Sequence, residues 1–490
     1  MTLAPETDTV ATGRRQWIAL GVLCLATLLV SLDLFVMLLA VPAVTEALGA
    51  TSSQQLWILD VYGFMVAGLM ITMGTLGDRL GRRRLLLIAA AVFGIASIVA
   101  AYSVNPGMLI GARAVLGIAG AAIAPCTLSL ISTLFPDERQ RAKALGVWAG
   151  CFTVGAVVGP IVGGVLLNHF WWGSAFLIGV PAMVVLLIAG PFLLPEYRNE
   201  QAGRIDVPSV LLSLAAILPA IHGLKHLASH GAGVQSIGAL VVGGVFGWIF
   251  VRRQRRLDDP LVDVRLFTRR TFSVTLGSML AFSMLSGGVM VFVAQYFQLV
   301  QGMTPLAAGL PLVPGMLTTT VAFQVAPRLA QRIRPSVLIP AGIAFTVVGM
   351  AMMSLATSTT VLLIAFAIQC VGPAPLVTLG TNLVIGSVPP EKAGSAGALT
   401  QTSNEFGYSL GIAVLGSVVT AAYRSHMDGR GGNSLGEAIA QGATGDLLNQ
   451  ARDAFTGGLH LAAGITAVAL TAVAVLLAVT LRAIPALSRR

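Results

Sequence analysis

Long apolar segments separated by short polar ones run through the whole chain. Each segment has about the 20 residues that an α-helix needs to cross the hydrocarbon core of a bilayer. The pattern predicts fourteen membrane-spanning helices, near residues 17–41, 55–75, 84–103, 107–133, 144–168, 174–194, 207–228, 234–252, 271–300, 304–328, 335–355, 359–387, 394–423 and 458–482. We therefore expect an all-α polytopic membrane protein.

The distribution of basic residues predicts how these spans are oriented. Of the 30 Lys and Arg residues, 25 fall on one side when the spans alternate in direction, and five do not: Arg113, Lys225, Arg424, Arg430 and Arg452. Short cytoplasmic loops carry an excess of Lys and Arg, so we place both termini in the cytoplasm. The basic segment 252–270 is then a cytoplasmic amphipathic linker that contacts anionic lipid.

Composition supports the membrane assignment and excludes other classes. The 490 residues are 56% hydrophobic and 10% charged, whereas a soluble domain carries about 25% charged residues. The net charge of +10 comes from short clusters between apolar runs, so we expect no nucleic-acid partner. The sequence shows no metal-ligand spacing, phosphate-binding loop or nucleophile motif. We expect no enzyme activity, no catalytic residue, no metal and no cofactor.

Two pairs of weakly similar short segments indicate an internal repeat. "DRLGRR" (78–83) resembles "PRLAQR" (327–332), and "PDER" (136–139) resembles "PPEK" (389–392). Both pairs are offset by eight spans, as in two six-helix halves with an extra pair between them. Such repeats are typical of secondary transporters. The predicted organisation is a first half at 1–200, an inserted helix pair at 201–257 and a second half at 258–490.

Asp33 is a carboxylate inside the apolar run "LLVSLDLFVMLLA" (28–40). An acid at the centre of a spanning helix costs roughly 2.5–3.5 kcal/mol on insertion scales and usually marks a functional site. Arg113 lies in the fourth span, and it needs an interior partner because a guanidinium does not deprotonate in proteins. Asp33 is the candidate partner.

The second span, "QQLWILDVYGFMVAG" (54–68), adds a second acid. Trp57, Asp60 and Phe64 are spaced by three and four residues, so they share one helix face. Asp60 and Asp33 are expected at similar depths, in the outer half of the membrane. Two acids beside aromatic rings suit a lipophilic cation. The alternative for Trp57 is an anchor at the membrane interface.

The loop after the second span carries a recognisable motif, "GTLGDRLGRRR" (74–84). Its glycines allow close helix approach, its aspartate can accept from backbone N–H groups at a helix N-terminus, and its arginines hold the loop inside. This stretch resembles the loop motif of the major facilitator superfamily, and the matching residues are Gly74, Gly77, Asp78, Arg79, Gly81 and Arg82. The resemblance implies the major facilitator fold.

The fifth span, "GVWAGCFTVGAVVGPIVGG" (146–164), has a longer pattern: Gly146, Gly155, Gly159, Pro160, Gly163 and Gly164. Glycines four apart leave a bare strip for tight packing, and the proline bends the helix. Ordinary packing explains Gly159 with Gly163 but not the complete pattern. The whole resembles the antiporter motif of facilitator-family exporters, which implies export.

Three further stretches refine the resemblance. Glu405 lies roughly mid-span in "ALTQTSNEFGYSLGIAVLG" (398–416), and together with "LD" in the first span and "WILDVY" in the second it resembles the quaternary-ammonium exporters of the QacA type. Residues 292–315 resemble the fourteen-span drug-exporter branch, where Gln295, Tyr296 and Gln298 either line the cavity or pack between helices. The family resemblance also implies that Arg113 takes part in proton transfer; a purely structural ion pair is the alternative.

These observations lead to one expected function and two alternatives. We expect a proton-coupled antiporter that exports lipophilic cationic drugs by alternating access, as a monomer in a bacterial cell membrane, powered by the proton gradient. Desolvation disfavours charged carboxylates, so Asp33, Asp60 and Glu405 are candidate proton carriers. The alternatives are a dedicated exporter of one metabolite or self-made antibiotic, and an importer. His222, Lys225 and His226 are expected to snorkel to the outer interface.

Overall fold

The structure is a computed structural model that describes residues 13–196, 206–257, 260–388, 393–428 and 430–481. Within these ranges the regular elements are helices, and fourteen of them are long and apolar enough to cross a membrane. This confirms the predicted number of spans and the all-α class. The predicted boundaries at 200/201 and 257/258, and the "PPEK" repeat at 389–392, involve residues outside the described ranges.

The helices follow one another with short connections. Their bounds are α1 Arg14–Leu48, α2 Ser52–Leu80, α3 Arg82–Ala101, α4 Pro106–Leu134, α5 Glu138–His169, α6 Ser174–Leu177, α7 Gly179–Leu193, α8 Val207–His230, α9 Val234–Gln254, α10 Arg270–Gly287, α11 Val289–Gln295, α12 Pro305–Gly309, α13 Val313–Ala330, α14 Pro335–Ser354, α15 Thr359–Gln369, α16 Pro373–Gly386, α17 Ala393–Met427, α18 Leu435–Ala440 and α19 Gly445–Thr480. Short 3-10 or π turns lie at Val264–Thr268, Tyr296–Val300 and Leu310–Leu312.

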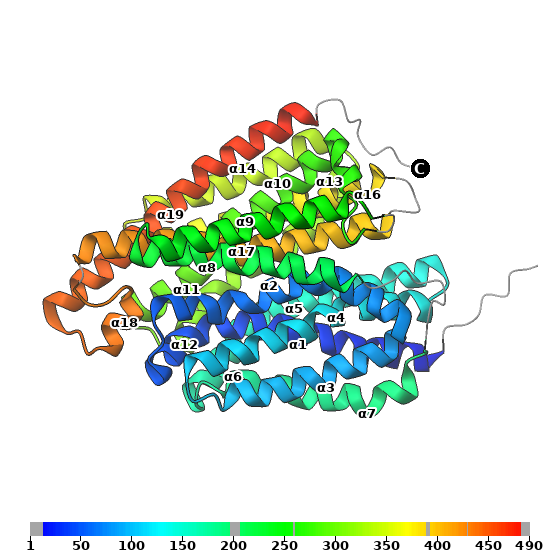
Figure 1. Ribbon diagram of the computed structural model, residues 1–490, viewed down its shortest axis with the longest axis horizontal. Helices are drawn as coiled ribbons and strands as arrows, with labels where there is room; N and C mark the ends of the chain where they lie inside the picture. Colours follow the sequence, from blue (N-terminus) through cyan, green and yellow to red (C-terminus); the bar gives the residue numbers. More distant parts are fainter. Residues whose placement is uncertain (1–12, 197–205, 258–259, 389–392, 429, 482–490) are drawn as a thin grey trace, which may run out of the picture.

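Two bundles lie side by side, and a helix pair runs along the seam between them (Figure 1). Helices α1 to α7 form the first bundle, where α1 packs on α5 and α2 packs on α4. Helices α10 to α17 and α19 form the second, where α14 packs on α19 and α10 on α17. Across the seam, α2 contacts α17 and α5 contacts α12, while α8 contacts both α2 and α17.

Local sequence explains where the helices of the first bundle begin and end. The Thr51 side chain accepts a hydrogen bond from the Gln54 backbone N–H and caps α2, and Asn105 caps α4 in the same way before Pro106. Between α2 and α3 the chain turns through Gly81 alone, at φ 102°. Only glycine adopts this conformation without strain. Gly81 therefore allows α3 to begin directly after α2 ends.

The long segment between the last two spans differs from its prediction. The sequence places a loop at 424–457, but α18 lies within it and α19 already begins at Gly445, well before the apolar stretch. The apolar pattern detects only the part of a helix that lies in lipid. Polar residues at the first turns of α19, such as Asp446 and Arg452, extend the helix beyond that part.

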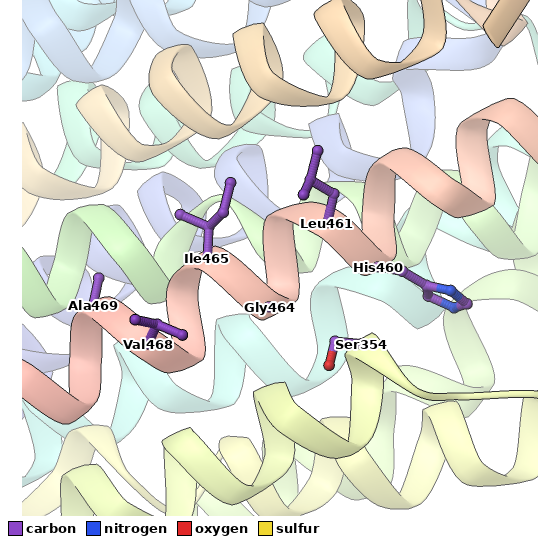
Figure 2. Close-up of a pocket in the computed structure, with 7 residues that line it drawn as sticks. All are labelled: Ser354, His460, Leu461, Gly464, Ile465, Val468 and Ala469. Carbon is purple, nitrogen blue, oxygen red and sulfur yellow. The ribbon is translucent and has the colours of Figure 1, made fainter.

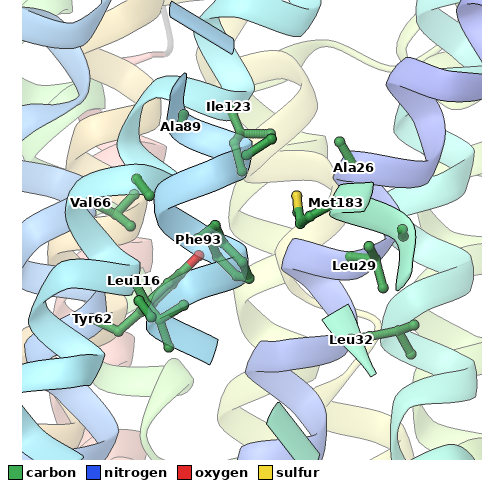
Figure 3. Close-up of a cluster of buried hydrophobic side chains, with 14 of the residues drawn as sticks. Ala26, Leu29, Leu32, Tyr62, Val66, Ala89, Phe93, Leu116, Ile123 and Met183 are labelled. Carbon is green, nitrogen blue, oxygen red and sulfur yellow. The ribbon is translucent and has the colours of Figure 1, made fainter. Parts of the chain in front are cut away.

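Apolar clusters fill both bundles and the seam between them. Leu29 of α1, Met183 of α7 and Phe93 of α3 belong to one cluster of the first bundle (Figure 3). Ile412 of α17 also belongs to this cluster, and Leu39 of α1 belongs to a cluster that lies mainly in the second bundle. The apolar cores of the two bundles are therefore in contact across the seam.

We call the end of the molecule where α1 begins and α19 ends the termini end, and the opposite end the far end. The start of α1 and the end of α19 lie toward the right in Figure 1, and α18 lies at the left, at the far end. These two terms describe the ends without reference to a membrane.

Candidate functional site

Asp33 of α1 and Arg113 of α4 form a buried ion pair. Arg113 Nη1 donates to Asp33 Oδ2 at 2.7 Å, and Arg113 Nε donates to the Ile58 carbonyl oxygen at 3.1 Å. The guanidinium also lies over the Tyr62 ring, 4.7 Å from its centroid. The Arg113 side chain is 1% exposed. The structure thus confirms the partner predicted for Arg113, and three groups compensate the buried charge.

Glycines in α4 bring the Arg113 helix against α2. A Cβ atom on Gly117 would lie 2.5 Å from the Tyr62 carbonyl oxygen, and one on Gly120 would lie 2.7 Å from the Tyr62 hydroxyl oxygen. Both positions therefore require glycine for this approach. The close packing is what brings Arg113 within reach of the Ile58 carbonyl.

Asp60 of α2 is paired with Lys225 of α8. Lys225 Nζ lies 2.9 Å from Asp60 Oδ1 and 2.8 Å from Asp60 Oδ2, and it lies 4.1 Å from the centroid of the Trp57 ring. The two charged side chains are 1% and 0% exposed. The predicted face of Trp57 and Asp60 does hold a cation, and that cation is the ammonium of this chain.

The prediction that Lys225 snorkels to the interface is therefore wrong. Its span lies against α2, so the side chain turns inward to the Asp60 carboxylate instead of reaching out to water. His222 and His226, on the same side of α8, are half-buried, with ring centroids 6.1 Å apart. Position along a span could not show which helix covers this face.

Glu405 of α17 has a different environment from the two aspartates. Its Oε1 accepts a hydrogen bond from Gln401 Nε2 at 3.0 Å, and no basic side chain pairs with it among the described residues. Glu405 is partly exposed, and Gln401, one turn nearer the termini end, is exposed. Tyr62 and Tyr408 both lie within electrostatic range of the Glu405 carboxylate.

The Glu405 region of α17 is held against α10 by close backbone contacts. Ser283 Oγ donates to the Asn404 carbonyl oxygen at 2.7 Å. A Cβ atom on Gly407 would lie 2.7 Å from the Leu280 carbonyl oxygen, and one on Gly411 would lie even closer to Met284. Glu405 is therefore carried on a closely packed helix pair.

Phe64 is a packing residue at the seam in this conformation. It is fully buried, with Phe406 edge-on at 6.0 Å between ring centroids. Ile221 of α8 and Ala413 of α17 complete the cluster. The sequence predicts that Phe64 lines the substrate cavity, but α8 and α17 cover it here, because α8 closes the face that the helical spacing left open.

The three polar residues of the ninth span lie in three different settings. Gln295 lines a narrow cavity of about 40 Å³ together with Leu59 and Phe292. Tyr296 Oη accepts from Gln301 Nε2 at 2.9 Å. Gln298 Nε2 is buried without a hydrogen-bond partner among the described residues. Tyr296 and Gln298 lie within the π turn Tyr296–Val300, and Gln295 directly precedes it; this type of irregularity is frequent at functional sites.

In the loop motif, Asp78 pairs with a side chain. Asp78 Oδ1 lies 2.5 Å from Arg82 Nη2, and among the described residues no backbone N–H group donates a hydrogen bond to Asp78. The turn at Gly81 brings Arg82 back over the end of α2, and a Cβ atom on Gly77 would meet the Arg82 side chain at 3.0 Å. Gly74 faces open space, so its predicted helix contact is not made.

The glycines of the fifth span contact two different helices. Cβ atoms on Gly155, Gly159 and Gly163 would lie 2.7, 2.7 and 3.1 Å from atoms of α1. A Cβ atom on Gly164 would lie 2.5 Å from Leu306 Cα in α12, across the seam. Gly146, by contrast, has open space around it. The motif therefore closes the two bundles on each other near the far end.

A second contact across the seam closes the far end further. The carboxylate of Glu437, in α18, accepts hydrogen bonds from the Ser52 backbone N–H and hydroxyl at the start of α2. Nearby, a Cβ atom on Gly416 of α17 would lie 2.5 Å from the Leu56 side chain of α2. The structure is thus a conformation that is sealed at the far end.

One cavity lies away from these acids. It has a volume of about 680 Å³ and lies between α14 and α19, where it is lined by Ser354, His460, Leu461, Gly464, Ile465, Val468 and Ala469 (Figure 2). None of these residues belongs to the candidate site.

Comparison with known proteins decides the family. The sequence model of the Major Facilitator Superfamily matches residues 23–412 of this chain. The chain belongs to the Major Facilitator Superfamily. It is accordingly a multi-pass membrane protein of a transporter family, as its motifs indicate.

Curated relatives in this superfamily cover nearly the whole chain. The multidrug efflux pump LfrA of Mycolicibacterium smegmatis is 39% identical over 97% of this chain and 98% of its own length. The methyl viologen resistance protein SmvA of Salmonella typhimurium is 33% identical over 90% of this chain and 93% of its own length. A solved bacterial homologue of the human lysosomal transporter Spinster, inward-facing and unoccupied, has a TM-score of 0.71 at 16% identity, covering 96% of this chain and 98% of that chain. This last likeness supports the fold.

Sequence reasoning missed several residues of the site. Lys225 is assigned to the wrong place by the sequence, because its spacing from His222 and His226 does not indicate Asp60 as its partner. Tyr62 stood inside the quoted "WILDVY" motif, and Gln401 lies four residues before Glu405, so helical spacing could have identified both.

Proposed function

We propose that this protein is a proton-coupled exporter of lipophilic cations, acting in a bacterial cell membrane with both termini in the cytoplasm. The observation that carries the proposal is the contrast between the three intramembrane carboxylates. Asp33 and Asp60 are each paired with a basic side chain, whereas Glu405 meets only Gln401 among the described residues. A carboxylate without a basic partner can pair with a cation brought by the substrate.

The surroundings of Glu405 suit an organic cation. Tyr408 and Tyr62 lie within electrostatic range of the carboxylate, and aromatic faces attract organic cations. The far end is sealed and Gln401 is exposed toward the termini end. With the termini in the cytoplasm, this is the conformation that would take up substrate from inside.

Exchange follows from competition for one negative charge. A cationic drug binds when Glu405 is ionised, and a proton from the outside displaces the drug once the molecule opens at the far end. One proton per monovalent cation would be electroneutral, and each additional proton would contribute about 2.3 kcal/mol per 100 mV. The protein supplies a charge and two access states, and the proton gradient supplies the energy.

The Asp33–Arg113 pair has a separate role in this proposal. Arg113 keeps its charge in both states, so protonation of Asp33 would leave Arg113 with only the Ile58 carbonyl and the Tyr62 ring. Tyr62 lies within electrostatic range of Asp33, Arg113 and Glu405. Proton binding at Asp33 or at Glu405 would therefore change the electrostatic potential at the other acid, through the charges around the Tyr62 ring.

The test is transport in proteoliposomes under an imposed pH gradient, with ethidium as the cation and an uncharged dye as comparison. We expect gradient-dependent ethidium movement in the wild type and its loss in Glu405→Gln. Asp446→Asn, which removes an exposed acid at the start of α19, is the matched control and should transport normally. Movement of neither dye by the wild type would contradict the proposal and favour a dedicated metabolite exporter.

A further inference from the structure

The inserted helix pair lies between the two bundles and contacts both. Helix α8 packs on α2 of the first bundle and on α17 of the second, and α9 packs on the outside of α8 (Figure 1). Apolar side chains of α9 are exposed along its length, including Val234, Val241 and Trp248. When the two bundles move relative to each other, helices α8 and α9 must stay with one bundle and slide on the other.

The contact with α2 combines apolar packing with a polar and directional ion pair. Lys225 Nζ lies within 2.9 Å of both Asp60 carboxylate oxygens and over the Trp57 ring. Both charged side chains are removed from solvent. Pulling such a pair apart would leave two uncompensated charges in a low-dielectric environment. About two helical turns after Asp60 on α2, a Cβ atom on Gly68 would lie 2.9 Å from Leu214 Cδ2. This part of the interface between α2 and α8 is therefore also closely packed.

The contacts that the described residues of α8 make with α17 are apolar. Ile217, Leu218 and Ile221 of α8 belong to one cluster with Phe406, Leu410 and Ala413 of α17. Apolar contacts are non-directional, so this surface can slide without breaking an ion pair. The difference between the two sides of α8 indicates which bundle it follows.

We propose that the Asp60–Lys225 ion pair fixes helices α8 and α9 to the first bundle. These two helices then slide together on α17 as the transporter changes state. Lys225 is then a positioning residue that occupies the Trp57–Asp60 face permanently. Asp60 serves as its counter-ion and neither binds substrate nor exchanges the coupled proton. This inference goes beyond the proposed function and is independent of the identity of the cation carried.

Charge-paired variants test the role of Asp60 in transport. Asp60→Asn and Lys225→Met each leave one buried charge unpaired, and we expect each to lower ethidium transport by about tenfold or more. The double variant removes both charges, so it should recover most of the wild-type rate, with the wild-type pH dependence. A double variant as inactive as Asp60→Asn would overturn the proposal, since it would show that the carboxylate itself is needed. Glu405→Gln serves as the inactive reference.

Distances between spin labels test the attachment without any transported dye. Val104 follows α3, Leu355 follows α14 and Val234 begins α9; all three are exposed at the far end. In a variant with the four native cysteines replaced, we expect the Val234–Val104 distance to stay constant between acidic and alkaline buffer. The Val234–Leu355 and Val104–Leu355 distances should change together as the far end opens. A constant Val234–Leu355 distance with a changing Val234–Val104 distance would overturn the proposal. Failure of ethidium transport alone would instead count against the proposed function.

Discussion

At the scale of single residues, the position of a charge in the sequence says less than the partner it finds. Asp33 and Arg113 were identified as partners from the rule that a buried guanidinium needs an acid. Asp60 and Lys225 were not, because nothing along the chain indicates that α8 lies against α2. The result is three intramembrane acids with different environments, of which Glu405 has no basic partner among the residues that the structure describes.

Removal of Asp33 should be costly for stability as well as for transport. In Asp33→Asn, Arg113 keeps its charge but loses its carboxylate partner, and breaking a buried pair in this way typically costs about 3–5 kcal/mol. We expect a clearly lower unfolding temperature in detergent. Asp33→Asn combined with Arg113→Met should regain most of the loss. An unchanged unfolding temperature in the single variant would show that the pair contributes nothing to stability.

Asp206 gives a prediction outside the membrane-spanning segments. Burial raises the pKa of Asp206, but hydrogen bonds from Arg253 and Ser209 outweigh it, so the pKa lies below the ordinary value of 3.8. The carboxylate therefore stabilises the fold at neutral pH, and this contribution is lost as pH falls through the lowered pKa.

Asp206→Asn keeps an N-cap for α8 and removes only the charge. We expect the variant to unfold at a lower temperature than the wild type at neutral pH, with the difference closing in acid below about pH 4. A difference that stays the same across this range would contradict the assignment. Thermal unfolding at a series of pH values is the measurement.

At the scale of helices, glycine spacing was the informative signal. The sequence predicted close packing of the fifth span, and the structure gives it a direction: Gly155, Gly159 and Gly163 contact α1, whereas Gly164 contacts α12 across the seam. Spacing alone could not assign the partner helices, because each face of a spanning helix is apolar. The start of α19 was misplaced for a related reason, since its first turns are polar and lie outside the apolar window.

Substitution of Gly164 should weaken the sealed conformation. In Gly164→Val the new side chain meets the Leu306 backbone, and overpacking of this kind costs about 1–3 kcal/mol. We expect slower ethidium transport and a longer Val104–Leu355 distance. Gly146→Val, in open space on the same helix, is the control and should behave as the wild type. Equal effects of both substitutions would argue against a specific closing contact.

At the scale of the whole molecule, the sequence predicted the fourteen spans, the superfamily and the Asp33–Arg113 pair, because lipid imposes strong rules on composition. It could not predict the conformational state, which depends on contacts between bundles at the far end. Nor could it show that α8 bridges the seam. The account that results is a sealed far end, two internally paired aspartates and one glutamate that we propose exchanges a cation for a proton.

The most direct test of this account is the pH dependence of cation binding to the purified protein. Competition at one carboxylate predicts that the affinity for tetraphenylphosphonium rises with pH, by up to about tenfold per pH unit while Glu405 is mostly protonated. In Glu405→Gln the affinity should be low and independent of pH. A wild-type affinity that does not change with pH, or that Glu405→Gln reproduces, would contradict the claim that one carboxylate serves both drug and proton.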